Sequence, residues 1–272
     1  MKFNEPVLHA TQFPRSNAYN PEWVLASGSG GANSLWLTEW LTSIMDLKPG
    51  MRVLDLGCGR AMSSIFFARE FGVTTWATDL WFSPQENSRR IHDAGLESLV
   101  FPIRADARNL PFATEFFDAI ISIDAFAYFG TDDHYLSYLA RYLKPDGVLG
   151  ISCAGFVDEF DDETPPHLAE LLEAEPAMWS MHSPRWWRRH WEKTGIVGIE
   201  RADLMPEGWK YWLEWHKQIA PDNQLEITTL EADQGRCMGY YRVVARRRNQ
   251  VQLPDPIITI PENYLSKPLL RP

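Results

Sequence analysis

Three aspartates each close an apolar run, and their spacing predicts one shared binding site. Asp55 lies in VLDLGCGRA (residues 53–61), Asp79 ends VTTWATD (73–79), and Asp106 ends LVFPIRAD (99–106). If the three runs are neighbouring parallel strands, their carboxyl ends open into one crevice. The sequence therefore predicts a crevice with three carboxylates, which suits a ligand that carries positive charge.

The turn after the first apolar run indicates what kind of ligand approaches the backbone. Gly57 and Gly59 are spaced so that a strand can open into a helix with no Cβ in the way of a ligand. A dinucleotide fingerprint needs a third glycine three residues after the second, and that position is Met62. An acidic residue before the first glycine would also repel a pyrophosphate, so a nicotinamide dehydrogenase is disfavoured.

S-adenosylmethionine carries an amino group and a sulfonium, and the aspartates fall where this molecule needs them. Asp79 lies 20 residues after Gly59, where a carboxylate accepts ribose hydroxyls. Asp106 is placed to accept from the adenine amino group, and the Ala107 amide is placed to donate to a ring nitrogen. Asp55 alone would also be explained as a helix cap, but its partners favour the cofactor role.

The elements that position these residues alternate between short apolar strands and amphipathic helices, which predicts an α/β fold with a parallel sheet. Helices are expected at residues 34–45, 62–71, 84–95 and 132–145. Strands are expected at 51–57, 73–79, 99–106, 116–124 and 146–152.

The regular alternation of strands and helices ends after residue 152. The whole chain has 12 tryptophans, and most of them lie in this late half, which makes it unusual. An acidic stretch (155–180) is followed by a Trp/Arg-rich helix (183–195), a strand (196–204), an aromatic helix (208–220) and a last strand near 238–247. Most of these tryptophans are expected to pack on the sheet, and one or two to line a substrate pocket. The basic cluster on 185–193 is expected to be solvated or paired with the acidic stretch.

Composition limits the class of protein. The 272 residues carry a net charge of −10 and 45% hydrophobic residues, which is typical of a globular chain and opposes unaided binding to nucleic acid. No apolar run is long enough to cross a bilayer, and residues 1–16 do not resemble a signal peptide. Three scattered cysteines predict reduced thiols without a disulfide framework or metal site, and so a cytoplasmic location.

Four strings in the expected order resemble the class I S-adenosylmethionine-dependent methyltransferases, in particular the small-molecule branch of the ubiquinone/menaquinone-biosynthesis type. They are VLDLGCGRA, ATDLW, RADARNLPFATEFFDAI and YLKPDGVLGIS, and they cover roughly residues 50–153. The resemblance implies a Rossmann-like seven-stranded sheet with helices on both faces, an antiparallel last hairpin and a helical lid after the fifth strand. It implies cofactor contacts at Asp55, Gly57, Gly59, Asp79, Leu80, Asp106 and Ala107.

Two positions depart from the pattern of that family. Its third glycine is Ala61 here, a small substitution that we expect to be tolerated. Ala127 stands where many relatives have a histidine, so no catalytic base is carried over from the family.

The catalytic candidates are Asp124 and Tyr128, which follow the fourth strand, and His182. His134, His190 and His216 are further candidate bases, although a single histidine is more often a packing residue. A base is needed only if the acceptor has a proton to lose.

We therefore predict methyl transfer from S-adenosylmethionine, giving S-adenosylhomocysteine, to a small-molecule acceptor that carries an amine or an aromatic ring, with N- or O-methylation favoured. The alternatives are a non-catalytic S-adenosylmethionine-binding sensor or partner subunit, and C-methyl or cyclopropane-type transfer to a lipid. A base-amino DNA methyltransferase is disfavoured because DAFAYF replaces its Pro-Pro motif after the fourth strand. We expect no resident metal and no nucleic-acid partner, and a homodimer is the candidate assembly.

The expected organisation is an N-terminal arm and helix (1–45) that covers the cofactor site, a methyltransferase domain (46–248) with an aromatic-rich insertion at about 154–220, and a proline-rich extension (249–272).

Overall fold

The computed structural model describes residues 10–28, 31–160 and 163–253 of the chain, and its centre is one seven-stranded sheet. The strand order is β3-β2-β1-β4-β5-β7-β6. Most of the proline-rich extension predicted at the C-terminus, and the first nine residues of the predicted arm, lie outside the described residues.

Five neighbouring strands run parallel, and β3 forms one edge of the sheet. They are β1 (Arg52–Leu56), β2 (Thr74–Asp79), β3 (Val100–Arg104), β4 (Phe117–Ile123) and β5 (Leu143–Phe156). β7 (Met238–Arg247) pairs antiparallel with both β5 and β6 (Val197–Leu204). The predicted fold class and antiparallel last hairpin are confirmed.

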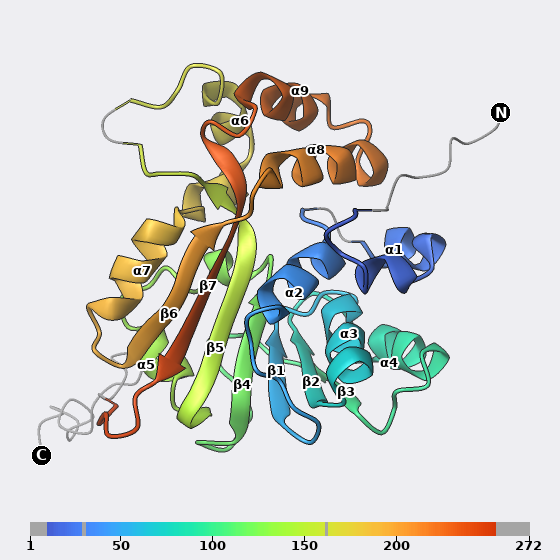
Figure 1. Cartoon of the computed structure of the whole chain (residues 1–272), viewed down its shortest axis with the longest axis vertical. Helices are drawn as coiled ribbons and strands as arrows, with labels where there is room; N and C mark the ends of the chain where they lie inside the picture. Colours follow the sequence, from blue (N-terminus) through green and yellow to red (C-terminus); the bar gives the residue numbers. More distant parts are fainter. Residues whose placement is uncertain (1–9, 29–30, 161–162, 254–272) are drawn as a thin grey trace, which may run out of the picture.

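Helices cover both faces of the sheet, each with its own hydrophobic core (Figure 1). One face is covered by α2 (Ser34–Thr42), α3 (Met62–Phe71) and α4 (Pro84–Asp93), and α1 (Pro21–Ser27) lies beside these helices. The other is covered by α5 (Tyr135–Leu139) and α7 (Pro184–Glu192). Two-sided coverage explains why β1 and β4 are buried along nearly their whole length.

The remaining helices gather beyond the carboxyl ends of the parallel strands, at the top of Figure 1. We call this group the cap; it consists of α6 (Ala169–Ala174), the 3₁₀ helix η3 (Pro176–Ser180), α8 (Gly208–Ile219) and α9 (Gln224–Asp233). The cap is formed by two excursions of the chain, one before β6 and one after it. β6 itself is an edge strand of the sheet. In the part of the chain that the structure describes, no helix is both long and apolar enough to span a bilayer.

The tryptophans of the late half are mainly core residues, as we expected for most of them. Trp187 and Trp191 of α7, and Trp212 and Trp215 of α8, have at most 2% of their surface exposed. They hold α7 on the β6–β7 side of the sheet and α8 against β7. The count that looked unusual in the sequence is therefore mostly explained by packing.

Local differences from the prediction have local causes. The helix predicted at 132–145 is α-helical only over Tyr135–Leu139, because the chain leaves it in a series of turns toward β5. Pro145 lies within β5, at an irregularity of the β4–β5 register. α1 and α9 were not predicted, although Asn20 and Asn223 cap their first turns.

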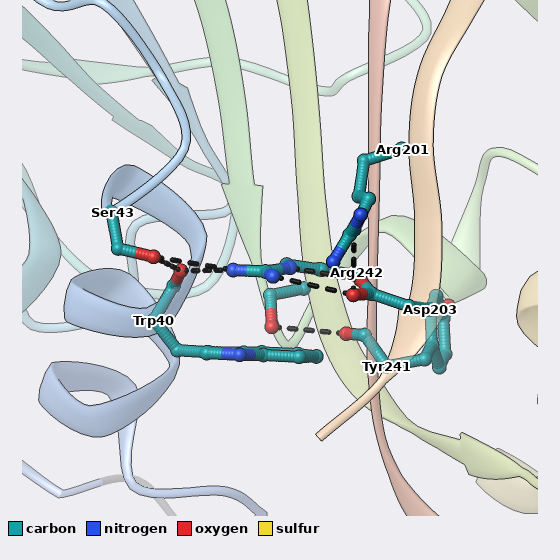
Figure 2. A network of polar contacts seen from close by, with 7 residues as sticks. Trp40, Ser43, Arg201, Asp203, Tyr241 and Arg242 are labelled. Carbon is teal, nitrogen blue, oxygen red and sulfur yellow. Dashed lines mark hydrogen bonds and ion pairs between the residues drawn. The ribbon is translucent and has the colours of Figure 1, made fainter. Parts of the chain in front are cut away.

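A buried arginine joins the N-terminal helix α2 to the antiparallel hairpin (Figure 2). Arg242 of β7 donates to Asp203 of β6 at 2.9 Å, to the Trp40 carbonyl at 2.6 Å and to Ser43 Oγ at 3.2 Å. Its guanidinium lies 4.3 Å from the centre of the Trp40 ring. Arg201 also binds Asp203 at 2.8 Å, so one carboxylate is shared by two arginines.

Removing this buried cation should destabilise the fold. We expect Arg242→Met to lower the free energy of unfolding by about 3 kcal/mol, because it leaves Asp203 and the Trp40 carbonyl without a buried partner. The measurement is urea unfolding followed by circular dichroism. The control is Arg246→Met, on the same strand as Arg242. It removes an exposed ion pair with Glu200 and should lower the free energy of unfolding by less than about 1 kcal/mol. Equal effects of the two substitutions would contradict this assignment.

Candidate active site

A cavity of about 280 Å³ lies at the carboxyl ends of β1, β2 and β4. Its size is close to the lower end of the usual range for small-molecule sites, about 300–1,000 Å³. The predicted site residues that line it are Gly57, Gly59, Asp79, Leu80, Asp106, Ala107, Asp124 and Tyr128. Asp55 lies outside this lining, and so does His182. The structure thus brings together strand ends that are far apart in the sequence.

The turn between β1 and α3 forms the floor of the cavity. Gly57 has φ +78°, and a Cβ there would approach Ala125 Cβ to 2.4 Å, so a side chain would collide with the loop after β4. Ala61 has φ +60° just before α3, in the left-handed region that favours glycine. Alanine adopts this backbone conformation at a cost of about 1 kcal/mol in strain. We predicted that alanine is tolerated at this position.

Asp79 connects two loops that border the cavity. Its Oδ2 accepts from the Gly59 amide at 2.8 Å, and its Oδ1 accepts from the amides of Trp81 and Phe82 at 2.8 and 3.0 Å. Each carboxylate oxygen has two lone pairs, so this side chain can still accept from a ligand that enters the cavity. The bonds fix its orientation before any ligand binds.

Asp55 is completely buried behind the cavity floor. Its Oδ2 accepts from the hydroxyls of Ser63 and Ser64 at 2.6 and 2.5 Å, whereas its Oδ1 has no hydrogen-bond partner. Burial raises the pKa of this carboxyl to about 6, although the two serine hydroxyls oppose the shift. Ser63 lines the cavity and lies between Asp55 and the ligand space, so a bound cation would favour the charged carboxylate.

The loop after β3 contributes Asp106 and Ala107. Asp106 accepts from Arg108 at 2.9 and 2.7 Å, and these hydrogen bonds lower the pKa of the carboxyl. Tyr135 donates to the Ala107 carbonyl at 3.0 Å, and Tyr138 accepts from the Leu110 amide at 2.6 Å. The α5 segment therefore holds this loop in the position that exposes Asp106 and Ala107 to the cavity.

Exposed aromatic and apolar side chains lie around the cavity mouth. Trp81 and Tyr128 are 74% and 54% exposed, and their ring centres are 5.8 Å apart. Leu80 is also largely exposed. Burial and the nearby Asp124 carboxylate raise the pKa of Tyr128 to about 12, so its hydroxyl stays protonated near neutral pH. Trp81 follows β2, whereas we expected the pocket-lining tryptophans in the late half of the chain.

Arg60 closes another side of the cavity. Its guanidinium donates to the Gly28 carbonyl and lies 4.9 Å from the centre of the Phe82 ring. It therefore links the end of α1 to the two loops that Asp79 joins. The predicted cover of the site by the N-terminal arm and helix (1–45) stays a prediction.

Asp124 has a structural partner for each of its oxygens. It adopts φ +53°, and its Oδ2 accepts from the Ala32 amide at 2.6 Å. Its Oδ1 accepts from Cys153 Sγ and from the Ala154 amide, both at 3.3 Å. A Cβ on Gly31 would approach Asp124 Oδ2 to 2.3 Å, which explains the glycine there. Asp124 thus anchors the N-terminal segment, and its catalytic role stays a prediction.

The histidines lie away from the cavity. His182 Nδ1 lies 2.9 Å from Glu159 Oε2. The His182 ring stacks on Trp186, with ring centres 3.6 Å apart. His190 stacks on the same indole and contacts the Gly130 carbonyl at 3.2 Å, and His216 forms a buried pair with Glu226 at 3.0 Å. Among the described residues that line the cavity there is no histidine, and His134 is exposed. His182 is therefore placed as a packing residue, so its predicted catalytic role has no support from this geometry.

The basic cluster on α7 is solvent-facing and finds nearby partners. Arg188 pairs with Glu192 at 3.3 Å, and Lys193 pairs with Asp133 at 2.5 Å. The described part of the acidic stretch 155–180 is not their partner in these contacts. Pairing along and beside the helix accounts for Arg188 and Lys193 without a ligand.

Comparison with known proteins supports what the site geometry indicates. Residues 53–147, from β1 into β5, match the model of a methyltransferase domain family. The fold is that of a putative sarcosine dimethylglycine methyltransferase from Galdieria sulphuraria, with a TM-score of 0.65 and 22% identity over 80% of this chain and 87% of that one. The chain therefore carries a methyltransferase domain over residues 53–147.

Curated relatives of this chain match over only part of their length. The methyltransferase GfsG of Streptomyces halstedii is 34% identical over 43% of this chain and 42% of its own. The glycine/sarcosine/dimethylglycine N-methyltransferase of Actinopolyspora halophila is 28% identical over 59% of this chain and 28% of its own. The chain thus spans less than half the length of these relatives.

The residues of the methyltransferase site fit S-adenosylmethionine. The glycine turn leaves room where a Cβ would collide, and Asp79 and Asp106 present acceptors on adjacent strand ends. The unpartnered, buried Oδ1 of Asp55 provides further negative potential behind the floor. Asp79 and Asp106 would hold the ribose and adenine, and the Ala107 amide would complete the adenine contact.

Reading the sequence missed several supporting residues of the methyltransferase site. Ser63 and Ser64 could have been recognised as candidates, since they follow the glycine turn in the first turn of α3. Tyr135 and Tyr138 gave no local signal, because they bind a loop almost 30 residues earlier in the chain. Arg60 was equally hidden, as its partner Gly28 lies 32 residues away.

The raised pKa of Asp55 makes a stability prediction with a definite sign. Its carboxyl binds a proton more tightly in the folded than in the unfolded state, so stability falls as pH rises from about 4 to about 6 and then levels off. Asp55→Asn keeps an oxygen that accepts from both serines and does not titrate. Without cofactor, wild type should therefore lose about 2 kcal/mol relative to Asp55→Asn between about pH 4.5 and about pH 7.5.

The measurement for Asp55 is urea unfolding of both proteins at several pH values. The difference between the two proteins cancels the titration of every other group that the substitution leaves unchanged. A difference that does not vary with pH would show that Asp55 has an ordinary pKa in the folded protein.

The tyrosine support of the adenine loop can be tested by removing one hydroxyl. We expect Tyr135→Phe to weaken binding of S-adenosylhomocysteine about fivefold, because loss of one buried hydrogen bond of about 1 kcal/mol frees the Ala107 carbonyl. Isothermal titration calorimetry measures the affinity. Tyr19→Phe is the matched control. The Tyr19 hydroxyl donates to Glu70 at 3.2 Å, and neither residue lines the cavity. Unchanged affinity in Tyr135→Phe would contradict the positioning role.

Proposed function

We propose that this protein transfers the methyl group of S-adenosylmethionine to a small-molecule acceptor. The observation that carries the proposal is the joint placement of the Gly57 turn, Asp79 and Asp106 around one cavity at the carboxyl ends of adjacent parallel strands. The match of residues 53–147 to a methyltransferase domain family supports the same cofactor. The named relatives that match in sequence are methyltransferases, so we favour catalysis over a purely cofactor-binding subunit.

The chemistry asks little of the protein's own side chains. When bound, the cofactor supplies a methyl group that its sulfonium already activates. The protein contributes alignment and exclusion of water, which can account for much of the rate. Asp79 fixes the loops that hold the cofactor, while Arg60 and the Asp124–Ala32 bond keep the N-terminal segment over the site.

The acceptor side of the cavity favours a small amine or an aromatic compound, with methylation at N or O. Trp81 and Tyr128 present ring faces at the mouth, where a cationic amine would gain a cation–π interaction. Asp124 places negative charge on the same side. The relative from Actinopolyspora halophila is named as an N-methyltransferase of glycine, sarcosine and dimethylglycine, which supports an amine. The homodimer and the cytoplasmic location stay predictions.

The decisive test combines binding and turnover. We expect wild type to bind S-adenosylhomocysteine in calorimetry, and to produce it from S-adenosylmethionine in step with a methylated product when amines and phenols are supplied. Asp79→Ala and Asp106→Ala should each weaken binding by at least tenfold, because each removes an acceptor from the cavity. Asp106 is held mainly by Arg108, so its removal is expected to leave the fold intact.

The matched control is Asp93→Ala, which removes an exposed carboxylate at the end of α4 and should bind as wild type does. Unchanged binding in both cavity variants would contradict the proposed site. Binding without product from any acceptor would favour the cofactor-binding subunit instead.

A further inference from the structure

A second group of potential ligand atoms lies away from the cavity, where the cap meets the start of β7. His167 lies in the turn before α6, Asp233 is the last residue of α9, and Cys237 directly precedes β7. One side-chain ligand atom from each lies within 4.8 Å of the other two. Proposed methyl transfer uses none of these residues.

The carboxylate of this group is oriented from behind by the backbone. Asp233 is completely buried, and it accepts from the amide of Met238 at 2.9 Å and from the amide of Cys237 at 3.1 Å. Metal-binding carboxylates are commonly fixed in this way by hydrogen bonds on the side away from the ion. Arg236 donates to the main-chain carbonyls of Ala232 and Asp233, so its cation does not form an ion pair with the carboxylate here.

The other two side chains reach the same carboxylate from the more open side. His167 Nε2 is 2.8 Å from Asp233 Oδ1, and its side chain is 22% exposed. Cys237 is partly exposed as well, and its thiol lies beside the carboxylate. An ion can therefore enter between His167 and Cys237, and water can supply a fourth ligand.

We propose that His167, Asp233 and Cys237 form a zinc site that joins the two excursions of the cap. Imidazole nitrogen, carboxylate oxygen and thiolate sulfur are the ligand types of zinc in proteins, and the mixture with sulfur disfavours magnesium and calcium. From the sequence we expected no metal site, because the chain has no paired cysteines and these ligands are spread over 71 positions, from 167 to 237.

The required movement is small. Tetrahedral zinc with bonds of about 2.0–2.3 Å holds its ligand atoms about 3.3–3.6 Å apart. His167 Nε2 and Asp233 Oδ1 would have to separate by about half an ångström from their 2.8 Å contact. Zinc takes the place of the hydrogen between these atoms. The neutral His167 ring moves its single proton from Nε2 to Nδ1, and the Cys237 thiol releases its proton to solvent.

The site would stabilise the arrangement of the cap. His167 belongs to the excursion before β6, whereas Asp233 and Cys237 belong to the one after it. Zinc would hold the turn before α6 against the α9–β7 junction, close to where Val157 bonds to the Cys237 carbonyl. Zinc that binds the folded state raises its stability by mass action.

The experiment uses the full chain without a polyhistidine tag, stripped with a chelator and titrated with Co²⁺ and then Zn²⁺. We expect one Co²⁺ per chain with a thiolate-to-cobalt charge-transfer band, displaced by Zn²⁺, and a zinc-dependent rise in melting temperature. Cys237→Ala should remove the band and weaken zinc binding at least 100-fold, since it deletes a direct ligand.

His167→Gln separates ligation from folding, because glutamine can still donate a hydrogen bond to Asp233 but is a poor zinc ligand. It should fold as wild type does without metal and lose the zinc-dependent rise in melting temperature. His92→Ala is the control, since His92 forms an exposed pair with Glu97 at 2.5 Å and should leave zinc binding unchanged.

Absence of the charge-transfer band in wild type would overturn the proposal, as would equal zinc affinity in wild type and Cys237→Ala. In either case the three side chains would form a hydrogen-bonded junction only. These readouts do not depend on methyl transfer, so they test the zinc site separately from the proposed activity.

Discussion

The hydrogen bonds of Asp79 are the constraint on which the arrangement of the site depends most. Its carboxylate accepts hydrogen bonds from backbone amides of the loop after β1 and of the loop after β2. These two segments would otherwise diverge above the sheet. Gly59 is drawn toward β2 by this bond, and Gly57 fits beneath the Ala125 side chain. Because the side chain is only 8% exposed, its bonds are shielded from water and it holds both loops before a ligand binds.

Further contacts extend this arrangement outward in layers. The α5 tyrosines fix the loop after β3, and Asp124 with Arg60 ties the N-terminal segment across the opening. Arg242 then anchors α2 on the β6–β7 hairpin, so the cover of the site is connected to the far edge of the sheet. The site is therefore built by segments from nearly the whole chain, and the matched domain of residues 53–147 supplies its floor.

Much of this could be predicted from the sequence, and the reason is local encoding. Strand ends with Asp55, Asp79 and Asp106 carry their signal within a few residues, and α3 was predicted at 62–71 as observed because Gly72 ends it. Placement of side chains is a different problem. Asp124 and Tyr128 both line the cavity as expected, yet only the fold shows that the Asp124 carboxylate is held by Ala32, 92 residues earlier.

The aromatic composition shows the same limit. The spacing of Trp187 and Trp191 correctly predicted a packed helix face, whereas the exposed indole at the cavity mouth is Trp81, which has no periodic partner. The fold alone also does not decide chemistry, because one fold can carry many unrelated activities. Methyl transfer is therefore proposed from the site and from the match of residues 53–147 to a methyltransferase domain.

The most direct test of the central claim is a crystal structure of the protein with S-adenosylhomocysteine. We expect the ribose hydroxyls on Asp79, the adenine between Leu80 and the Asp106–Ala107 loop, and the sulfur directed toward the Asp124 and Tyr128 side of the cavity. Density for the ligand outside this cavity, or a cavity that stays closed to it at saturating concentration, would contradict the account.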